Sequence, residues 1–270
     1  MIEKTVGFLG FGNMGAAILE GLVEKKVLPL AGAVVYDPSP SAIEAAQALG
    51  VTVAPDPEAL AQSSDVLILA VKPQIMDAAL AQIAPHLAAE ALIISIAAGI
   101  SSAYIQDRLG ADTRVIRVMP NTPYLVHAGA AGIAASPQCD AGDRELAHNM
   151  FASIGVAVEI DESKMDAVTA LSGSGPAYFF YMVECLVAAA VKEGLDPDVA
   201  AQLAGQTLYG AGKLLMESPD SAATLREKVT SPGGTTEAAL NAFRAEGLEA
   251  VVAKAVAAAV HRGRELGAKK

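Results

Sequence analysis

A glycine-rich segment near the amino terminus has the residue types and spacing of a dinucleotide-binding turn. Residues 10–15, with the sequence GFGNMG, follow an apolar strand-like run and open a helical pattern. In such a turn the first glycine permits a tight bend, the second lets the backbone approach a pyrophosphate, and the third allows close helix–strand packing. The anion lies at the helix N-terminus. We predict that a nicotinamide dinucleotide binds there, through Leu9, Gly10, Phe11, Gly12, Asn13, Met14 and Gly15.

The acidic residue Asp37 strengthens this prediction, because it ends the next strand-like segment about 20 residues after the turn. Its carboxylate can accept hydrogen bonds from both ribose hydroxyls of NADH, whereas the 2'-phosphate of NADPH would face its negative charge. No Arg or Lys occurs between Lys26 and Lys72. Asp37 taken alone therefore favours NADH, although Ser39 and the amides after Pro38 leave a phosphate site open.

Two further segments end strand-like runs and are predicted to hold the nicotinamide half of the cofactor. The carboxyl ends of parallel strands meet at one edge of a doubly wound sheet, where ligands bind. Lys72 can equally be a solvated residue that stops the strand, so its role stays open. The predicted contacts in these two segments are Ala70, Val71, Lys72, Pro73, Ala97, Ala98 and Gly99.

A third candidate segment, residues 231–236 with the sequence SPGGTT, has the features of an anion-binding turn before a helix. Pro232 cannot continue a helix, Gly233 and Gly234 present bare backbone, and a helical pattern starts at Thr235. Exposed amides at a helix N-terminus can bind a carboxylate without a basic residue. An ordinary turn with a threonine cap is the alternative.

The composition limits the classes of partner and chemistry. A formal net charge of -11 argues against a nucleic-acid or anionic-membrane partner, since phosphate binding needs clustered Lys and Arg. Cys139 and Cys185 form no CxxC pattern, so neither a disulfide framework nor a metal site is expected, and a reducing compartment fits. The histidines are scattered, which disfavours a hydrolase; they are His86, His127, His148 and His261.

The chain is expected to be soluble and cytoplasmic. Its first residues lack the basic, apolar and small-residue regions of a signal peptide. Apolar runs such as Val66–Val71 are too short to cross a bilayer, and the alanine-rich C-terminal stretch is interrupted by charged residues.

The elements that must position these residues follow two different periodicities. Short apolar runs alternate with helical patterns in residues 1–161, which predicts a parallel, doubly wound Rossmann-type sheet of the α/β class. From residue 162 to 270 the period is 3.6, which predicts an all-helical second domain. The predicted strands are Thr5–Gly10, Ala33–Asp37, Asp65–Lys72, Ala91–Ala97, Arg114–Met119 and, less clearly, Gly155–Asp161.

Two apolar stripes in the helical half need partners. They can pack in the chain's own core or be buried against a second subunit. One stripe comprises Phe179, Met182, Val183, Leu186, Ala190 and Val191, and the other comprises Leu240, Phe243, Leu248, Val251, Val252, Ala255 and Ala259.

Four motifs together resemble the pyrroline-5-carboxylate reductase family, and the resemblance spans nearly the whole chain. They are AVKPQ at 70–74, MPNTP at 119–123, LSGSGPAY at 171–178 and VTSPGGTT at 229–236. The resemblance implies reduction of 1-pyrroline-5-carboxylate to L-proline with NADPH, usual in the family, or NADH. It also implies a Rossmann domain followed by a helical dimerisation domain, and a homodimer that often assembles into a decamer. In the family the active site lies between the Rossmann domain of one subunit and helical elements of its neighbour.

The resemblance also implies a substrate pocket. By similarity Thr236 contacts the ring nitrogen and is the catalytic candidate, and Glu162 lies near the substrate, with a solvated first-turn carboxylate as the alternative for Glu162. The other implied substrate contacts are Ser231, Gly233, Gly234 and Thr235. Lys228, Asp56 and Pro57 depart from the asparagines found in relatives. These three positions lie where the resemblance implies contacts with the adenosine side of the cofactor.

Two other classes of protein share parts of this pattern. The β-hydroxyacid dehydrogenases have the same architecture, but their catalytic lysine lies four residues after a GxG, where this chain has Phe179. A non-catalytic dinucleotide sensor would use the helical half only for oligomerisation. Such a sensor needs no substrate clamp. The SPGGTT segment of this chain has the features of a clamp and so argues against a sensor.

Overall fold

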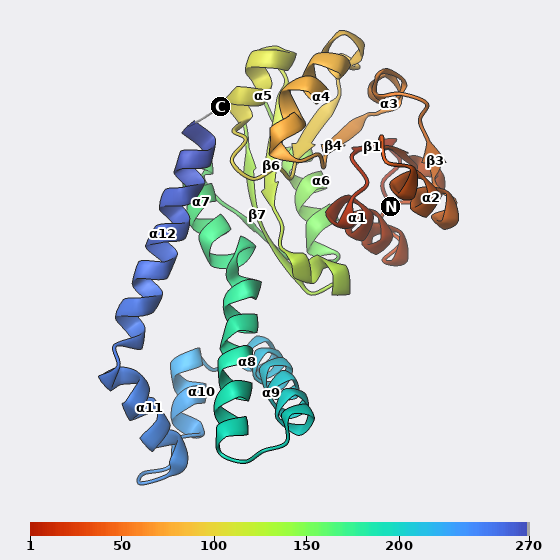
Figure 1. Ribbon diagram of the computed structural model, residues 1–270. Helices are drawn as coiled ribbons and strands as arrows, with labels where there is room; N and C mark the ends of the chain where they lie inside the picture. Colours follow the sequence, from red (N-terminus) through yellow and green to blue (C-terminus); the bar gives the residue numbers. More distant parts are fainter. Residues whose placement is uncertain (269–270) are drawn as a thin grey trace. The chain divides into compact units, whose positions relative to one another are not determined.

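The computed structural model describes residues 1–268 and contains one eight-stranded sheet (Figure 1). The strand order is β3-β2-β1-β4-β5-β6-β7-β8, which places the first strand in the middle of a doubly wound arrangement. All neighbouring pairs are parallel except β6 and β7. The strands are β1 (Val6–Leu9), β2 (Ala33–Tyr36), β3 (Thr52–Val53), β4 (Val66–Leu69), β5 (Leu92–Ser95), β6 (Arg114–Met119), β7 (Gly129–Ala135) and β8 (Gly155–Glu159).

The Rossmann-type fold predicted from the alternation of apolar runs and helical patterns is confirmed, and all six predicted strands are present. Two strands were missed. β3 has only two residues, and β7, with the sequence GAAGIAA, has one β-branched residue, Ile133, and no aromatic residue, so it lacks the composition that marks strands. Because β7 runs antiparallel to β6, the prediction of a wholly parallel sheet was wrong at this edge.

Helices cover both faces of the sheet, which explains why its central strands lack polar alternation. One core lies beneath α1 (Asn13–Glu24), α2 (Pro40–Leu49) and α6 (Ala141–Ala152). The opposite core lies beneath α3 (Pro57–Ser63), α4 (Met76–Ile83) and α5 (Ser102–Leu109). The sheet is therefore a rigid support whose carboxyl edge is left to loops.

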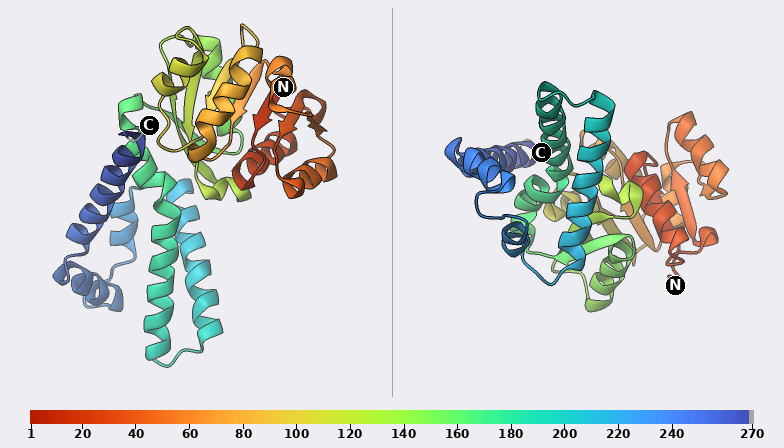
Figure 2. Two further views of the ribbon diagram at one scale, coloured as in Figure 1. Left: turned by 45° about the horizontal axis from the view of Figure 1, so that its top comes forward. Right: turned by 90° about the horizontal axis from the view of Figure 1, so that it is seen from below.

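The second half of the chain is helical, as predicted. A short α7 (Met165–Val168) continues into a π-helical turn, Thr169–Gly173. The following helices are α8 (Gly175–Lys192), α9 (Pro197–Glu217), α10 (Ala222–Lys228), α11 (Thr235–Ala245) and α12 (Leu248–Ala268). Helices α8 and α9 lie side by side (Figure 2). Gly247, at φ +71°, separates α11 from α12 and divides the second predicted stripe between them.

The described chain divides into two compact units. The Rossmann unit comprises residues 1–174 and the C-terminal segment from Ala259, and the helical unit is Gly175–Ala258. The predicted boundary at residue 161 remains a prediction.

Large apolar side chains of the helical unit remain exposed in the single chain. On α8, Phe179 is 59% exposed, Phe180 58% and Tyr181 67%, although they point in three successive directions around the helix. Of the residues in this unit, only Gly175 and Ala200 are buried. Packing within the chain therefore does not cover the predicted apolar stripes.

Candidate active site

The glycine turn after β1 has the geometry of a dinucleotide-binding turn. Gly10 has φ +101°, and a Cβ there would lie 2.8 Å from the carbonyl of Ala70. A Cβ at Gly15 would lie 2.6 Å from the Gly10 oxygen. Only glycine fits these two positions, because backbone blocks a side chain at both. The tight turn and the close helix approach predicted from the spacing are therefore present.

Gly12 differs from the other two glycines because the space beside it is open. Apart from its chain neighbours and its own helix, no described residue has an atom within 4 Å of a Cβ built there, and Gly12 is exposed at the N-cap of α1. No side chain caps this helix. The first-turn amides of α1 thus face open space that a pyrophosphate can fill. The residues present fit a dinucleotide.

Asp37 lies directly after β2 and is bonded to the glycine turn itself. Its Oδ2 accepts the amide of Phe11 at 2.7 Å, and its Oδ1 accepts the amide of Ser39 at 2.9 Å. The half-buried carboxylate is therefore fixed beside the predicted ribose site. Ser39 and Ser41 bond to each other through their hydroxyls at 2.9 Å, at the start of α2.

The two nicotinamide segments lie at the carboxyl ends of β4 and β5, which are adjacent in the sheet. The Ala70 backbone contacts Gly10, so this segment adjoins the glycine turn. Val71 is half-buried, Lys72 is exposed, and Pro73 begins a 3-10 turn. Ala97 is buried, whereas Ala98 and Gly99 are half-buried. The structure thus brings all the predicted cofactor residues to one edge, while a cofactor contact by Lys72 stays a prediction.

Glu162 occupies an ion-pair network in the Rossmann unit. Its Oε1 accepts a bond from Arg117 Nη1 at 2.8 Å and from the Ser102 amide at 2.8 Å, and its Oε2 accepts the Ser102 hydroxyl. Burial opposes ionisation, but these bonds and the charge of Arg117 together hold the pKa of Glu162 below its ordinary value. Glu162 is therefore ionised and held, and its contact with substrate remains a prediction.

Arg117 was not among the predicted site residues. It is 8% exposed and comes from β6, where the sequence RVIRVM places two charges in a buried strand. A charged residue in a buried strand needs a partner of opposite charge, so the two arginines of this strand were the signal that could have identified Arg117. Its partner lies 45 residues away, so spacing alone could not identify Glu162.

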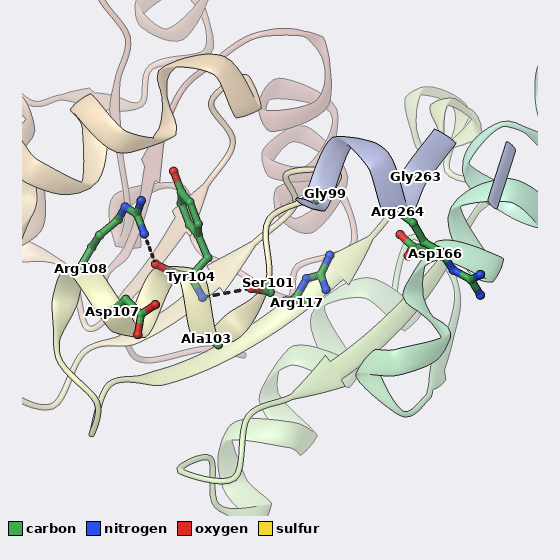
Figure 3. Close-up of a pocket in the computed structure, with 11 residues that line it drawn as sticks. Gly99, Ser101, Ala103, Tyr104, Asp107, Arg108, Arg117, Asp166, Gly263 and Arg264 are labelled. Atoms are coloured by element: carbon green, nitrogen blue, oxygen red, sulfur yellow. Dashed lines mark hydrogen bonds between the residues drawn. The ribbon is translucent and has the colours of Figure 1, made fainter. Parts of the chain in front are cut away.

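A pocket of about 450 Å³ adjoins Gly99 (Figure 3). Figure 3 shows Arg117 and Asp166 beside Gly263 and Arg264 of α12. Its walls also include Arg108 and Asp107, so two carboxylates offset most of the charge of three arginines. The pocket consequently has no strong preference for an anion.

The SPGGTT segment precedes α11 as predicted. Gly233 has φ +70°, and Gly234 is the N-cap of the helix without a side-chain cap. The amides of Thr235 and Thr236 occupy the first helical turn, where intrahelical partners are missing. Two amides are already used, since Gly233 donates to the Glu237 carboxylate at 2.8 Å and Gly234 donates to the Ser231 carbonyl at 2.9 Å. The segment therefore offers a carboxylate fewer free amides than the sequence pattern indicated.

The residues that depart from the family pattern have local partners. Asp56 is the N-cap of α3 and accepts the Ala59 amide at 2.7 Å. Lys228 forms an ion pair with Asp220. Both contacts stabilise the helix ends where they occur.

Comparison with known proteins gives matches along the whole chain. Residues 162–266 match the family model for pyrroline-5-carboxylate reductase dimerisation, and residues 5–99 match the model for NADP oxidoreductase, coenzyme F420-dependent. The chain is 42% identical to pyrroline-5-carboxylate reductase of Pseudomonas aeruginosa, covering 98% of each chain. It is 39% identical to the Methanosarcina acetivorans enzyme of the same name, covering 100% of each.

Solved structures agree. A pyrroline-5-carboxylate reductase from Coxiella burnetii is 35% identical with a TM-score of 0.93, covering 98% of this chain and 99% of that one. The Plasmodium falciparum pyrroline carboxylate reductase with NADP bound is 30% identical with a TM-score of 0.87, covering 99% of each chain. A ketol-acid reductoisomerase at 19% identity shares the fold alone.

Proposed function

The chain belongs to the pyrroline-5-carboxylate reductase family, and we propose how its own residues carry out that family's reaction. The reaction is the NAD(P)H-dependent reduction of 1-pyrroline-5-carboxylate to L-proline, the last step of proline biosynthesis. The observation that supports this function best is the open space at Gly12, on the same sheet edge as Asp37 and Ala97. A dinucleotide bound there extends toward the carboxyl ends of β4 and β5.

The cofactor supplies a hydride to the imine carbon when it is bound. The chain's task is chiefly positioning, because an imine is basic enough to arrive protonated. We assign the Thr236 hydroxyl to the ring nitrogen, which it orients by a hydrogen bond. The amides of Thr235 and Thr236 hold the substrate carboxylate, while Ser231, Gly233 and Gly234 shape the turn. Glu162 lies near the substrate in this proposal, oriented by Arg117.

For the cofactor we propose a preference for NADH over NADPH, with both accepted. The fixed Asp37 carboxylate favours the free 2'-hydroxyl and repels a 2'-phosphate. The Ser39 and Ser41 hydroxyls at the start of α2 leave a place for the phosphate. The Plasmodium falciparum relative has NADP bound, which supports acceptance of NADPH.

The functional assembly we propose is a cytoplasmic homodimer that assembles further into a decamer. One helical stretch, Glu162–Lys192, is long and apolar enough by length and composition to cross a membrane. The dimerisation model covers this stretch, so we assign its exposed face to a second subunit and not to lipid. In this arrangement the SPGGTT turn acts at the cofactor edge of the partner.

The role of Thr236 is tested by Thr236→Ala. Loss of one hydrogen bond that orients the reacting nitrogen should lower kcat about 10- to 100-fold, while the Kd for reduced cofactor stays within about twofold. Steady-state kinetics with fluorescence titration of cofactor measures both. Thr230→Ala is a matched control, because its hydroxyl only bonds the Arg226 carbonyl. If cofactor affinity fell while turnover of the bound complex survived, the assigned role would be wrong.

The activity itself is separated from its alternatives by substrate choice. We expect the purified protein to oxidise NADH and NADPH with 1-pyrroline-5-carboxylate, and not to oxidise a 3-hydroxy acid with NAD(P)⁺. Activity on the hydroxy acid would instead identify a β-hydroxyacid dehydrogenase. Cofactor binding without any turnover would identify a sensor.

A further inference from the structure

A buried asparagine joins two motifs that lie 51 residues apart in the chain. Asn121 follows β6 and is 8% exposed. Its Nδ2 donates to the carbonyl of Ser172 at 3.1 Å, and its Oδ1 accepts the amide of Ala130 at 2.9 Å. Because both ends of the side-chain amide are bonded, its orientation is determined by its partners.

The Ser172 carbonyl belongs to the π-helical turn Thr169–Gly173, immediately before α8. The wider spacing of hydrogen bonds in this turn is seen where the Ser174 amide donates to the oxygen of Thr169, five residues earlier, at 2.8 Å. Single π-helical turns within helices are rare and occur frequently at functional sites. A π-helical turn leaves carbonyl groups without their usual helical partners, and Asn121 donates a hydrogen bond to one of them, the carbonyl of Ser172.

A second contact holds the same turn. A Cβ at Gly173 would lie 2.7 Å from Cε of Met119, so this glycine allows the turn to approach the last residue of β6 closely. β6 neighbours β5, whose carboxyl end leads to Ala97 and Gly99. The turn is therefore held against the sheet edge assigned to the nicotinamide, by a hydrogen bond and by van der Waals contact.

We propose that Asn121 is a positioning residue for hydride transfer. It fixes residues Ser172 and Gly173 against the carboxyl end of β6, next to β5, and so maintains the geometry in which cofactor and imine meet. Asn121 acts through this segment and touches no reacting atom. The inference rests on the proposed function, since it concerns the rate of that reaction.

The physical reason to expect an effect on rate is the steepness of hydride transfer with distance and angle. A misplacement of about 1 Å can cost about 100-fold in rate. Asn121→Asp keeps an acceptor for the Ala130 amide but turns a carboxylate oxygen toward the Ser172 carbonyl, which repels the turn. Asn121→Ala removes both bonds without repulsion. Both variants leave the glycine turn at residues 10–15 unaltered.

A single-turnover experiment separates positioning from a purely structural role. The full-length protein, preloaded with one NADH per subunit at concentrations far above the Kd, is mixed rapidly with excess 1-pyrroline-5-carboxylate, and the loss of reduced nicotinamide absorbance is followed. The amplitude gives the fraction of active protein, and the rate constant gives the hydride-transfer step. Asn149→Asp, the same substitution at an exposed position on α6, is the matched control.

We expect Asn121→Asp and Asn121→Ala to lower the rate constant about 10- to 100-fold at full amplitude, while Asn149→Asp matches the wild type. A reduced amplitude with an unchanged rate constant would overturn the inference, because it indicates partial unfolding only. A rate constant equal to that of Asn149→Asp would also overturn it.

Gly173→Ala provides a second test if the Asn121 variants do not fold. It keeps Asn121 but brings a methyl group to 2.7 Å from Cε of Met119; because this is the end of a flexible side chain, which can move, the rate constant should fall by less than in the Asn121 variants, about 2- to 5-fold. A wild-type rate constant at full amplitude would contradict the inference. A wild-type protein that never reduces the imine would refute the proposed function instead, so the two failures are distinguishable.

Discussion

The Asp37 carboxylate holds the glycine turn and also determines which cofactor is preferred. A substitution of Asp37 tests the second effect through the ratio of activities with the two cofactors. Its carboxylate fixes the Phe11 and Ser39 amides and places a negative charge beside the ribose site. Asp37→Ser should therefore raise the ratio of kcat/KM for NADPH over NADH by at least about 10-fold. NADH loses the hydrogen bonds from its ribose hydroxyls to the carboxylate, and NADPH is no longer repelled through its 2'-phosphate. Steady-state kinetics with both cofactors measures this ratio.

Asp65→Asn is the matched control for Asp37→Ser. Asp65 also accepts a backbone amide, that of Thr5 at 2.8 Å, but it lies next to the amino end of β4. The cofactor ratio should not change in this variant. An unchanged ratio in Asp37→Ser would contradict the assigned role of Asp37.

Glu162 carries a pH-dependent part of the stability. Its pKa is lowered in the folded protein, so its ionised form stabilises the fold above the ordinary glutamate pKa of about 4.3, and this contribution is lost as the pH falls through the lowered value. Glu162→Gln should lower the free energy of unfolding by about 2 kcal/mol at neutral pH. The difference should become smaller at a pH below about 4, where Glu162 of the wild type becomes protonated. Urea denaturation at fixed protein concentration and several pH values measures the difference.

Glu90→Gln serves as the comparison for Glu162→Gln. Glu90 also pairs with an arginine of β6, Arg114, but at 3.9 Å and with a side chain 94% exposed. Such a surface pair contributes about 0–1 kcal/mol. A pH-independent difference between wild type and Glu162→Gln would contradict the ion-pair account.

The predictability of single residues depended on whether their partners are near in sequence. The spacing from the glycine turn located Asp37, and the turn chemistry located Gly10 and Gly12. Neither the bond from Phe11 to Asp37 nor the pair Arg117–Glu162 follows from spacing, because tertiary packing brings those partners together.

At the scale of elements, the first βα unit separates a packing glycine from a binding glycine. A Cβ at Gly12 meets no neighbouring residue, so Gly12→Ala should lower the free energy of unfolding by no more than about 1 kcal/mol, the cost of alanine at an N-cap. The added methyl nevertheless occupies the space of the pyrophosphate, and the Kd for reduced cofactor should rise at least about 10-fold. Thermal denaturation and fluorescence titration measure the two effects.

Gly15→Ala is the counterpart of this experiment. Its Cβ would lie 2.6 Å from the Gly10 oxygen, which predicts a loss of about 1–3 kcal/mol of stability. The account would be contradicted if Gly12→Ala bound cofactor like the wild type while Gly15→Ala was as stable as the wild type.

Elements with strong apolar periodicity were predictable, and elements defined by small residues were not. β4, with VLIL, and β5, with LIIS, follow from residue type. β7 forms because Gly129 and Gly132 accept close neighbours, the Tyr124 ring and the Val168 side chain, and no local pattern signals this. The π-helical turn is equally hidden, since its hydrogen bond with Asn121 joins residues that lie 51 positions apart in the sequence.

At the scale of the whole molecule, the exposed apolar side chains of the helical unit indicate burial against another subunit. Phe180→Asp places a charge in that proposed interface and should weaken association by at least about 2 kcal/mol, about 30-fold in dissociation constant. Turnover should fall with dissociation, because the substrate turn is proposed to act on the partner. Sedimentation velocity together with the activity assay measures both.

Leu49→Asp is the control for Phe180→Asp. Leu49 is an exposed apolar residue at the end of α2, in the Rossmann unit. It should leave assembly and activity unchanged. A Phe180→Asp protein that stays fully assembled and active would contradict the interface.

The most direct measurement is the transfer of deuterium from NADH labelled at the transferred C4 position to the product formed from 1-pyrroline-5-carboxylate. We expect L-proline that carries one deuterium on the former imine carbon, with one cofactor oxidised per proline formed, as read by mass spectrometry and chiral chromatography. Cofactor binding with no labelled proline would instead identify a dinucleotide-binding protein without reductase activity.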